Sequence, residues 1–153
     1  MKASHTELIV RALENGTVID HIPADKLFKI VSILNLDTIA DQITIGNNLE
    51  SKKLGKKGVI KIADKVFKAE ELNKIALLAP TARINIVKNY EVVEKIDLSL
   101  PEQINDILQC VNPMCVTNKQ PVATRFDLTD RKRGMLKCHY CERTVMLSEI
   151  VLK

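Results

Sequence analysis

Four cysteines constrain the fold of this chain more than any other feature of its sequence. They are the only cysteines among 153 residues, and they form two close pairs, Cys110 with Cys115 and Cys138 with Cys141. Two short loops of this kind can bring four thiolates into a tetrahedral arrangement around one cation, as in structural zinc sites. We therefore predict one structural Zn²⁺ ion held by Cys110, Cys115, Cys138 and Cys141.

Disulfide bonds are the alternative for these cysteines, and four cysteines allow three pairings. The first ten residues, MKASHTELIV, contain no apolar run of the kind found in signal peptides. We therefore expect a cytoplasmic chain in a reducing compartment, where metal sites are the more common use of paired cysteines. Four sulfur ligands would also close the coordination sphere of zinc, which argues against a small zinc enzyme because no position remains for water.

The position of the cysteines indicates two domains. Residues 1–97 hold nearly all the long apolar runs, whereas residues 98–153 form a segment close to the lower size limit for a self-sufficient core. A bound metal ion would supply the missing stability of that segment. The stretch DLSLP at residues 97–101 breaks the pattern and is a plausible linker. No run of 18 apolar residues occurs, so no membrane span is expected.

Hydrophobic periodicity predicts an α+β fold for residues 1–97. We expect strands at residues 8–13, 17–22, 42–46, 59–62, 83–87 and 90–96, helices at 24–35 and 68–79, and an exposed basic loop at 50–58. This order predicts a ferredoxin-like sandwich in which two helices cover one face of a mainly antiparallel sheet. Short strand signals at 124–128, 135–137 and 144–147 predict a small, zinc-bound all-β domain at residues 98–153.

The charge balance argues against a nucleic-acid partner. The chain has a formal net charge of +4, and residues 98–153 contain eight Lys/Arg against six Asp/Glu. Because Zn²⁺ with four thiolates carries a net charge of −2, the metal domain is close to neutral. A zinc-ribbon nucleic-acid-binding protein remains the alternative function, supported by the run Arg131, Lys132 and Arg133.

Asp20 and His21 form an adjacent acid–base pair at the end of a predicted strand. They could act as a general base and the group that orients it, but no nucleophile or oxyanion-binding motif accompanies them. A half-exposed histidine hydrogen-bonded to its neighbour is the simpler explanation.

Two lysines stand in otherwise apolar strands. Lys61 and Lys95 could converge on a polyphosphate if their strands are adjacent, and Asn85 and Tyr90 could then contact a nucleobase. Taken singly, each lysine has an ordinary explanation as a solvated strand residue, and the tyrosine as a packing residue.

Several segments together carry a family resemblance that covers essentially the whole chain. The segments, in order, are RALENGTVIDHIP at residues 11–23, IGNNL at 45–49, IKI at 60–62, NYEVVEK at 89–95 and the two cysteine loops. This series resembles the regulatory chain of aspartate carbamoyltransferase.

The resemblance implies a non-catalytic subunit of pyrimidine biosynthesis. It implies a homodimer of regulatory chains that joins catalytic trimers, with residues 1–97 as an allosteric domain for CTP and ATP, and with UTP as a further candidate effector. Residues 98–153 would contact the catalytic chain through the zinc loops, where Asn112 and Glu142 are the expected contact residues.

The resemblance also assigns an effector site. Asp20 and Lys61 would face the base and ribose, and Lys95 the phosphates, with alternation along the strand directing Glu94 away from them. The full set of expected effector-binding residues is Ala12, Leu13, Val18, Asp20, His21, Lys61, Asn85, Tyr90, Val92 and Lys95.

Overall fold

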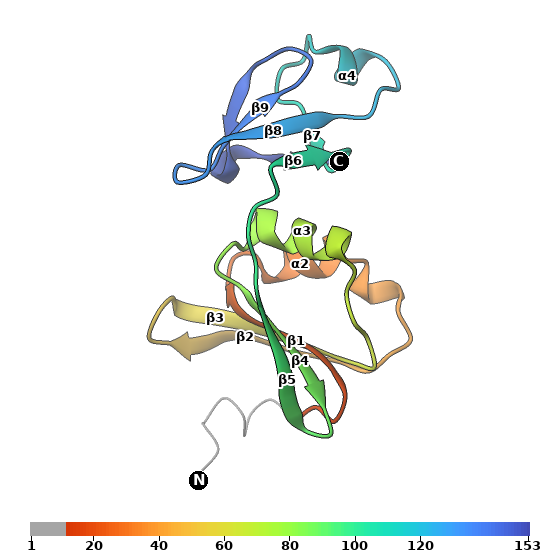
Figure 1. Cartoon of the computed structure of the whole chain (residues 1–153), viewed down its shortest axis with the longest axis vertical. Coiled ribbons are helices and arrows are strands. Elements are labelled where there is room, and N and C mark those ends of the chain that lie inside the picture. The colour runs from red at the N-terminus through yellow and green to blue at the C-terminus, as the bar shows by residue number, and fades with distance from the viewer. Residues whose placement is uncertain (1–11) are drawn as a thin grey trace. The chain divides into compact units, whose positions relative to one another are not determined.

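The computed structural model describes residues 12–153 of the chain (Figure 1). These residues belong to two compact units, the first ending at Ser99 and the second beginning at Leu100. Within the described part, no helix has the length and apolar composition needed to cross a membrane. The expected strand at residues 8–13 lies mostly outside the described residues, and Ala12 and Leu13 are not in a strand.

The described residues of the first unit form one five-stranded sheet and two α-helices. Its elements are β1 (Gly16–Pro23), α2 (Leu27–Ile33), the 3-10 helix η1 (Leu36–Thr38), β2 (Ile43–Ser51), β3 (Gly55–Ala63), α3 (Ala69–Leu78), β4 (Arg83–Lys88) and β5 (Glu91–Asp97). The strand order is β2-β3-β1-β4-β5, and every neighbouring pair is antiparallel. Strands β1 to β4 with the two helices form the predicted ferredoxin-like sandwich, and β5 extends its edge.

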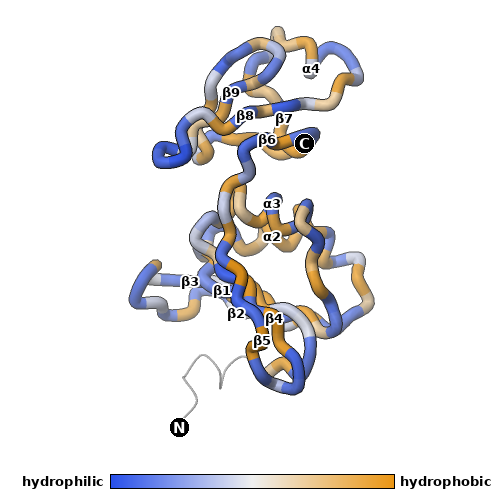
Figure 2. The backbone as a smooth tube through the Cα atoms, in the orientation of Figure 1, coloured by the Kyte–Doolittle hydropathy of each residue, from blue (hydrophilic) through white to orange (hydrophobic). Residues whose placement is uncertain are grey.

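Both α-helices cover the same face of this sheet, and the core lies between the two layers (Figure 1). Alternation along the central strands directs isoleucines into the core, and Figure 2 shows the hydrophobic stretches in α2, α3 and these strands. A Cβ atom added at Gly58 would lie 2.7 Å from the Leu27 side chain, so α2 packs closely on β3. The buried isoleucines of the sheet are Ile19, Ile22, Ile60, Ile62, Ile84 and Ile86.

The helix α2 is shorter than the predicted helix at residues 24–35. The backbone N–H of Lys26 donates to the Pro23 carbonyl at 2.8 Å, so a turn precedes the helix. Asn35 adopts a left-handed conformation with φ of 52°, which is incompatible with a continuing helix. In contrast, α3 agrees with its prediction to within a residue at each end, and Pro80 follows it.

The hairpin between β2 and β3 differs from the predicted basic loop at residues 50–58. β2 continues to Ser51 and β3 begins at Gly55, so only residues 52–54 form the turn. Glu50 lies opposite Lys56 in the ladder, where opposite charges stabilise strand pairing. The loop prediction was wrong because lysines on a solvated edge hairpin have the same composition as a loop.

The second unit is small and built mainly of short strands. Its elements are β6 (Gln103–Asn105), β7 (Leu108–Gln109), α4 (Val116–Lys119), β8 (Arg125–Asp130), β9 (Met135–Cys138), β10 (Thr144–Met146), the 3-10 helix η2 (Leu147–Glu149) and β11 (Val151–Leu152). They form a four-stranded sheet, β10-β9-β8-β6, and a two-stranded sheet, β11-β7. The predicted small strand domain around the four cysteines is confirmed, with α4 as a short helical turn.

Candidate functional site

The strand register aligns several predicted effector residues in one row across the first sheet. From β2 to β5, the paired residues are Thr44, Lys61, Val18, Asn85 and Lys95. Residues paired across neighbouring strands point to the same face of a sheet. The sheet therefore brings Val18, Asn85 and both lysines together.

This row lies on the face opposite the helices, which we call the open face. Lys61 stands between Ile60 and Ile62, which are both buried against the helices, so alternation directs Lys61 the other way. Asp20 follows Val18 by two residues and therefore shares the open face. Glu94 pairs with the buried Ile86, so it points away from Lys95, as alternation predicts.

Val92 also belongs to the open face. It pairs with Val87, which is two residues from Asn85 in β4, and its side chain is exposed. His21 differs from the others because it lies in a β-bulge of β1, where the register with β3 shifts between Ile19 and Ile22. Its φ of 57° is the left-handed conformation that such a bulge permits.

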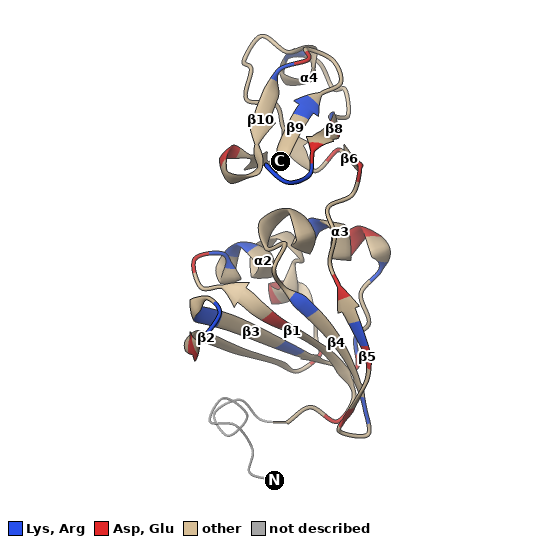
Figure 3. Cartoon of the chain, turned by 60° about the vertical axis from the view of Figure 1, so that its left-hand side comes forward, with Lys and Arg blue, Asp and Glu red and all other residues tan. Residues whose placement is uncertain are grey.

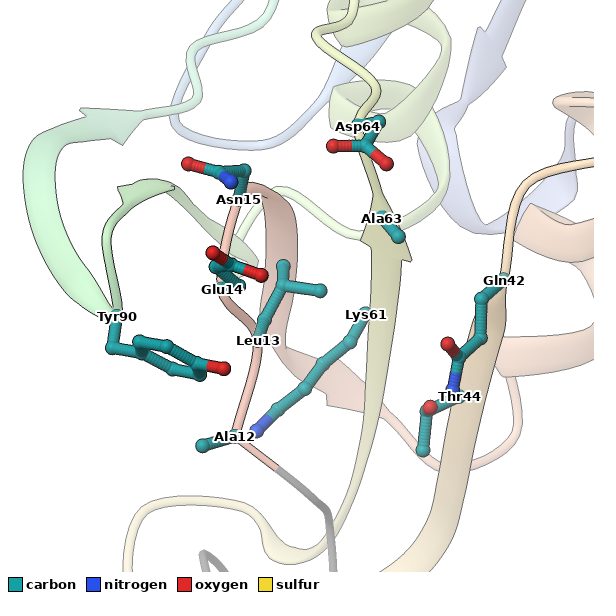
Figure 4. Close-up of a pocket in the computed structure, with 10 residues that line it drawn as sticks. All are labelled: Ala12, Leu13, Glu14, Asn15, Gln42, Thr44, Lys61, Ala63, Asp64 and Tyr90. Atoms are coloured by element: carbon teal, nitrogen blue, oxygen red, sulfur yellow. The ribbon is translucent and has the colours of Figure 1, made fainter.

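A cavity of about 350 Å³ opens beside Lys61 on this sheet (Figure 4). Four predicted effector residues line it: Ala12, Leu13, Lys61 and Tyr90. The other predicted residues do not line it. Its full lining is Ala12, Leu13, Glu14, Asn15, Gln42, Thr44, Lys61, Ala63, Asp64 and Tyr90.

Backbone hydrogen bonds hold the segment from Ala12 to Asn15 in place at this cavity. The Glu14 carbonyl accepts the N–H of Tyr90 at 2.9 Å, and the Asn15 carbonyl accepts that of Asp64 at 3.0 Å. The Asn15 side chain accepts the N–H of Asn89 at 3.2 Å. Because Asn89 and Tyr90 both have positive φ, the β4–β5 turn is a tight hairpin, and it presents the Tyr90 ring to the cavity (Figure 4).

Lys57 is a residue of this region that sequence reasoning missed. Its ammonium group lies 3.0 Å from the Asp20 carboxylate, which also lies 3.6 Å from Nδ1 of His21. The sequence suggested that Lys57 belonged to an exposed loop, whereas it is a half-buried residue of β3. Only the pairing of β1 with β3 brings it to Asp20, so no local signal could have identified it.

The row of paired residues carries positive charge at two separate positions, Lys61 and Lys95. Figure 3 shows bands of Lys and Arg on β3, β4 and β5. Lys61 on β3 and Lys95 on β5 are three strand spacings apart in the row, which corresponds to about 14 Å between their backbones. The hypothesis that Lys61 and Lys95 converge from adjacent strands is wrong, because β1 and β4 lie between their strands. The face can instead attract an elongated anion at both ends.

The four cysteines of the second unit converge as predicted. Their sulfur atoms all lie within 4.8 Å of one another, with Cys110 and Cys141 at 3.6 Å and Cys115 and Cys138 at 3.8 Å. With Zn–S bonds of about 2.3 Å, tetrahedral geometry requires sulfur atoms about 3.8 Å apart. The donor set thus fits one tetrahedral Zn²⁺ ion with a closed coordination sphere.

The pKa values of these thiols explain why a cation is needed. Burial raises the pKa of Cys110 to about 12 and also raises the pKa of Cys138. Burial acts on Cys141 too, but hydrogen bonds from the Arg143 backbone and the Asn112 side chain outweigh it and lower its pKa to about 7. At neutral pH the thiols of Cys110 and Cys138 keep their protons until a metal ion displaces them, so metal binding releases protons.

Asn118 and Thr117 support the first cysteine loop, and sequence reasoning did not identify either residue. The Asn118 side-chain amide donates to the Cys110 carbonyl at 2.9 Å and to the Asn112 carbonyl at 2.7 Å. The Thr117 hydroxyl donates to the Cys115 sulfur at 3.2 Å. Such outer-shell bonds orient metal ligands, but an isolated Asn or Thr gives no signal in the sequence.

The two predicted contact residues lie in the two cysteine loops. Asn112 is half-buried, and its side-chain oxygen accepts the N–H of Met114 at 3.0 Å. Glu142 is exposed in a left-handed conformation with φ of 63°. Exposed apolar side chains accompany them, with Met114 73% and Tyr140 44% exposed. This part of the unit is therefore an apolar surface around the metal site.

The chain matches two family models that together span most of its length. The model described as "Aspartate carbamoyltransferase regulatory chain, allosteric domain" matches residues 8–99, and the corresponding "metal binding domain" matches residues 102–151. The aspartate carbamoyltransferase regulatory chain of Parabacteroides distasonis is 50% identical over 147 residues, which is 96% of each chain. That of Phocaeicola vulgatus is 52% identical over 94% of this chain and 92% of the relative. That of Pyrococcus horikoshii is 47% identical over 95% of this chain and 97% of the relative. The chain therefore belongs to the family of aspartate carbamoyltransferase regulatory chains, the non-catalytic subunits of that enzyme.

Proposed function

We propose that this chain binds nucleoside triphosphates on the open face of its first unit and transmits their effect to catalytic trimers through its second unit. As a regulatory chain of the pyrimidine pathway, it works with the catalytic chain of aspartate carbamoyltransferase. CTP is the expected feedback inhibitor and ATP the expected activator, with UTP as a further effector.

The observation that carries the effector site is the row of paired residues on the open face. Lys95 stands at one end of it, and Lys61 stands near the other end, next to the cavity. An ammonium group is a strong point charge for phosphate, so Lys95 binds the triphosphate. The base then occupies the cavity beside Ala12, Leu13 and Tyr90.

The remaining expected residues surround the ribose between these two ends. Asp20 and Lys61 face the ribose and base, and the Asp20 carboxylate is already oriented by Lys57 at 3.0 Å. Val18 and Asn85 lie between the two lysines in the row, so they form the floor beneath the sugar. The other residues assigned to this site are His21 and Val92.

The apolar surface around the cysteine loops supports docking of the catalytic chain. Single exposed apolar residues are ordinary surface, but several gathered together mark an interaction site, and Val111, Met114, Val116 and Tyr140 are all exposed in or beside the two loops. Asn112 and Glu142 provide polar contacts in the same two loops. Because metal binding folds these loops, loss of zinc releases the catalytic chain.

Two regulatory chains pair in the proposed assembly. The described sheet of the first unit has two edge strands, β2 and β5. An edge strand offers unpaired backbone groups to a second copy, and the exposed Ile45 adds apolar area on β2.

The alternative of a nucleic-acid-binding zinc ribbon has little support from the basic run that suggested it. Residues 131–133 lie in the turn between β8 and β9. Arg131 donates to the Leu100 carbonyl at 2.6 Å, and Arg133 lies 3.7 Å from the Asp130 carboxylate. Two of the three basic side chains therefore already have partners within the unit.

Regulation requires that an effector bind two states of the assembly unequally, because equal affinity shifts no equilibrium. A coupling free energy of about 1–3 kcal/mol per effector is typical. Since CTP and ATP share the triphosphate, Lys95 supplies affinity for both, and discrimination depends on the base end of the site.

The test is calorimetric titration of the full, zinc-loaded chain with CTP and ATP, followed by the same titrations after Lys95→Ala. We expect both nucleotides to bind wild type and the variant to bind each about tenfold or more weakly, as for loss of a charged hydrogen bond. Lys88→Ala is the matched control, since Lys88 is an exposed lysine of the same hairpin, paired with Glu91. Retention of full affinity in Lys95→Ala would contradict the proposed phosphate site.

The second part of the test mixes the chain with catalytic trimers. We expect a larger complex whose carbamoyltransferase activity responds to CTP and ATP, and whose dissociation follows removal of zinc by a mercurial reagent. Carbamoyl transfer by the regulatory chain alone would contradict the assignment.

A further inference from the structure

Gln42 and Thr44 form a wall of the cavity that the expected effector residues do not include. Thr44 lies directly opposite Lys61 in the ladder between β2 and β3. Gln42 precedes it by two residues, and both side chains line the cavity (Figure 4). The Gln42 carbonyl accepts the N–H of Ala63 at 2.9 Å, so the backbone of this wall is held against β3.

The opposite wall is the segment from Ala12 to Asn15, which the hydrogen bonds from Tyr90 and Asp64 hold in place. Lys61 extends between the two walls, as Figure 4 shows. Since both walls are tied to the same sheet, their separation is set before any ligand binds. A ligand ring in this cavity therefore meets two fixed surfaces of different chemistry.

The two walls offer different groups to a nucleobase. Ala12 and Leu13 present aliphatic side chains, and the carboxylates of Glu14 and Asp64 also line the cavity. The Gln42 amide has both donors and an acceptor, and the Thr44 hydroxyl can act as either. Gln42 is exposed, and Thr44 is half-buried, so both can reach a ligand.

The size of the cavity, rather than its hydrogen-bonding groups, favours a purine over a pyrimidine at this wall. A glutamine amide can pair through two hydrogen bonds with N6 and N7 of adenine or with N4 and N3 of cytosine, so the choice depends on which base extends as far as Gln42. A purine has two fused rings, and the cavity has a volume of about 350 Å³. With one ring against the first wall, a purine extends further across the cavity than the single ring of a pyrimidine. We therefore expect the larger base to reach Gln42 and Thr44.

We propose that Gln42, together with Thr44, contacts the base of purine nucleotides but not that of pyrimidine nucleotides, and so sets the ratio of affinities for ATP and CTP. This inference rests on the proposed nucleotide site. It adds two specificity residues to that site, Thr44 on β2 and Gln42 immediately before this strand.

The experiment is calorimetric titration of the full, zinc-loaded chain with ATP and with CTP, comparing wild type, Gln42→Ala and Thr44→Val. We expect Gln42→Ala to weaken ATP about tenfold, as for loss of a two-hydrogen-bond base contact. CTP affinity should stay within about twofold, and Thr44→Val should have a smaller effect in the same direction. Gln120→Ala, an exposed glutamine of the second unit, is the control for loss of an amide elsewhere.

The outcomes separate this inference from the function on which it rests. If wild type binds neither nucleotide, both proposals are wrong. If wild type binds both nucleotides but Gln42→Ala weakens them equally, or changes neither, only the role of Gln42 is overturned. A selective loss of ATP affinity supports it.

Discussion

The interiors of the two units are filled by different means. In the first unit, aliphatic side chains from three strands and two helices fill the core, including Ile19, Ile60 and Ile84 with less than 2% exposure. In the second unit, three of the four cysteines are themselves among the buried residues. Besides these cysteines, the buried apolar side chains of the second unit are few: Leu100, Ile104, Leu108, Phe126, Leu136 and Val145.

This difference indicates that the two units depend on different interactions for stability. Burial of a full aliphatic side chain contributes about 1.5–3 kcal/mol, and the first unit has many of them. In the second unit, the space at the centre is lined by thiols, which gain little from burial without a cation. Removing the metal should therefore destabilise the second unit and leave the first unit folded. A core substitution should lower the stability only of the unit that contains it.

The largest expected effect is loss of the metal. Zinc binding to structural sites contributes about 10–16 kcal/mol at pH 7, more than a unit of this size has in reserve. Chelation should abolish amide-exchange protection in β8 and β9 while β1, β3 and β4 keep theirs. The comparison fails if both units lose protection together, or if neither does.

The affinity of the four cysteines for zinc should also depend on pH in a defined direction. Burial raises the pKa of Cys110 and Cys138, so these thiols bind protons when the metal is absent. Zinc must displace those protons, and its affinity therefore falls as the pH is lowered. A competition assay with a chromophoric chelator should show weaker zinc binding at pH 6 than at pH 8, both about one unit from neutrality. The opposite trend would contradict this account.

A core substitution in the first unit is expected to have the next largest effect. Ile62 is fully buried in β3, and Ile62→Ala should lower the free energy of unfolding of the first unit by about 2–5 kcal/mol. Chemical denaturation followed by amide exchange in each unit would measure it. Zinc content should stay at one ion per chain; loss of zinc in this variant would mean that the two units are not independent.

Asn118→Ala is expected to have a smaller effect, confined to the metal site. It removes two hydrogen bonds that hold the first cysteine loop. Loss of outer-shell support typically weakens metal binding about 10–100-fold. Lys119→Ala, which changes the neighbouring exposed residue of α4, is the matched control. Equal zinc affinity in Asn118→Ala and the control would show that the loop does not depend on this side chain.

The smallest expected effect concerns the ion pair between Asp106 and Lys153. The hydrogen bond from Lys153 lowers the pKa of Asp106, so the pair stabilises the fold above the unfolded-state pKa of about 3.9 and its contribution is lost only as the pH falls below that value. Asp106→Asn should therefore lower the melting temperature slightly, and by the same amount from about pH 6 to pH 8. If the difference in melting temperature between wild type and Asp106→Asn changed within that pH range, a further titrating group would have to interact with Asp106.

Much of the first unit could be predicted from periodicity. Strands such as β4 have isoleucines at every second position, and α3 has strong helix formers followed by Pro80. The short strands β6, β7 and β11 have only two or three residues each, too few for alternation to be recognised. The Lys57 assignment failed for a related reason, since a charged edge strand and a charged loop have the same composition.

The candidate sites also differ in how far the sequence alone could predict them. The zinc ligands could be predicted because cysteine pairs at close spacing are rare and have one dominant explanation. Lys61 and Lys95 were first considered as a pair on adjacent strands, which the sheet order contradicts, and their separate roles toward the base and the phosphates came from the family resemblance. Gln42 and Thr44 gave no signal of a binding role, because polar residues in or next to an edge strand are ordinary.

By itself, the sequence determined the metal site and the family. The two cysteine pairs are local motifs, and a four-sulfur site depends mainly on their spacing and on the preference of zinc for thiolate ligands. Only the tertiary structure decided which side chains share the open face. That outcome depends on the pairing of strands distant in the sequence, where a shift of one residue would turn Lys61 into the core and Ile62 out of it.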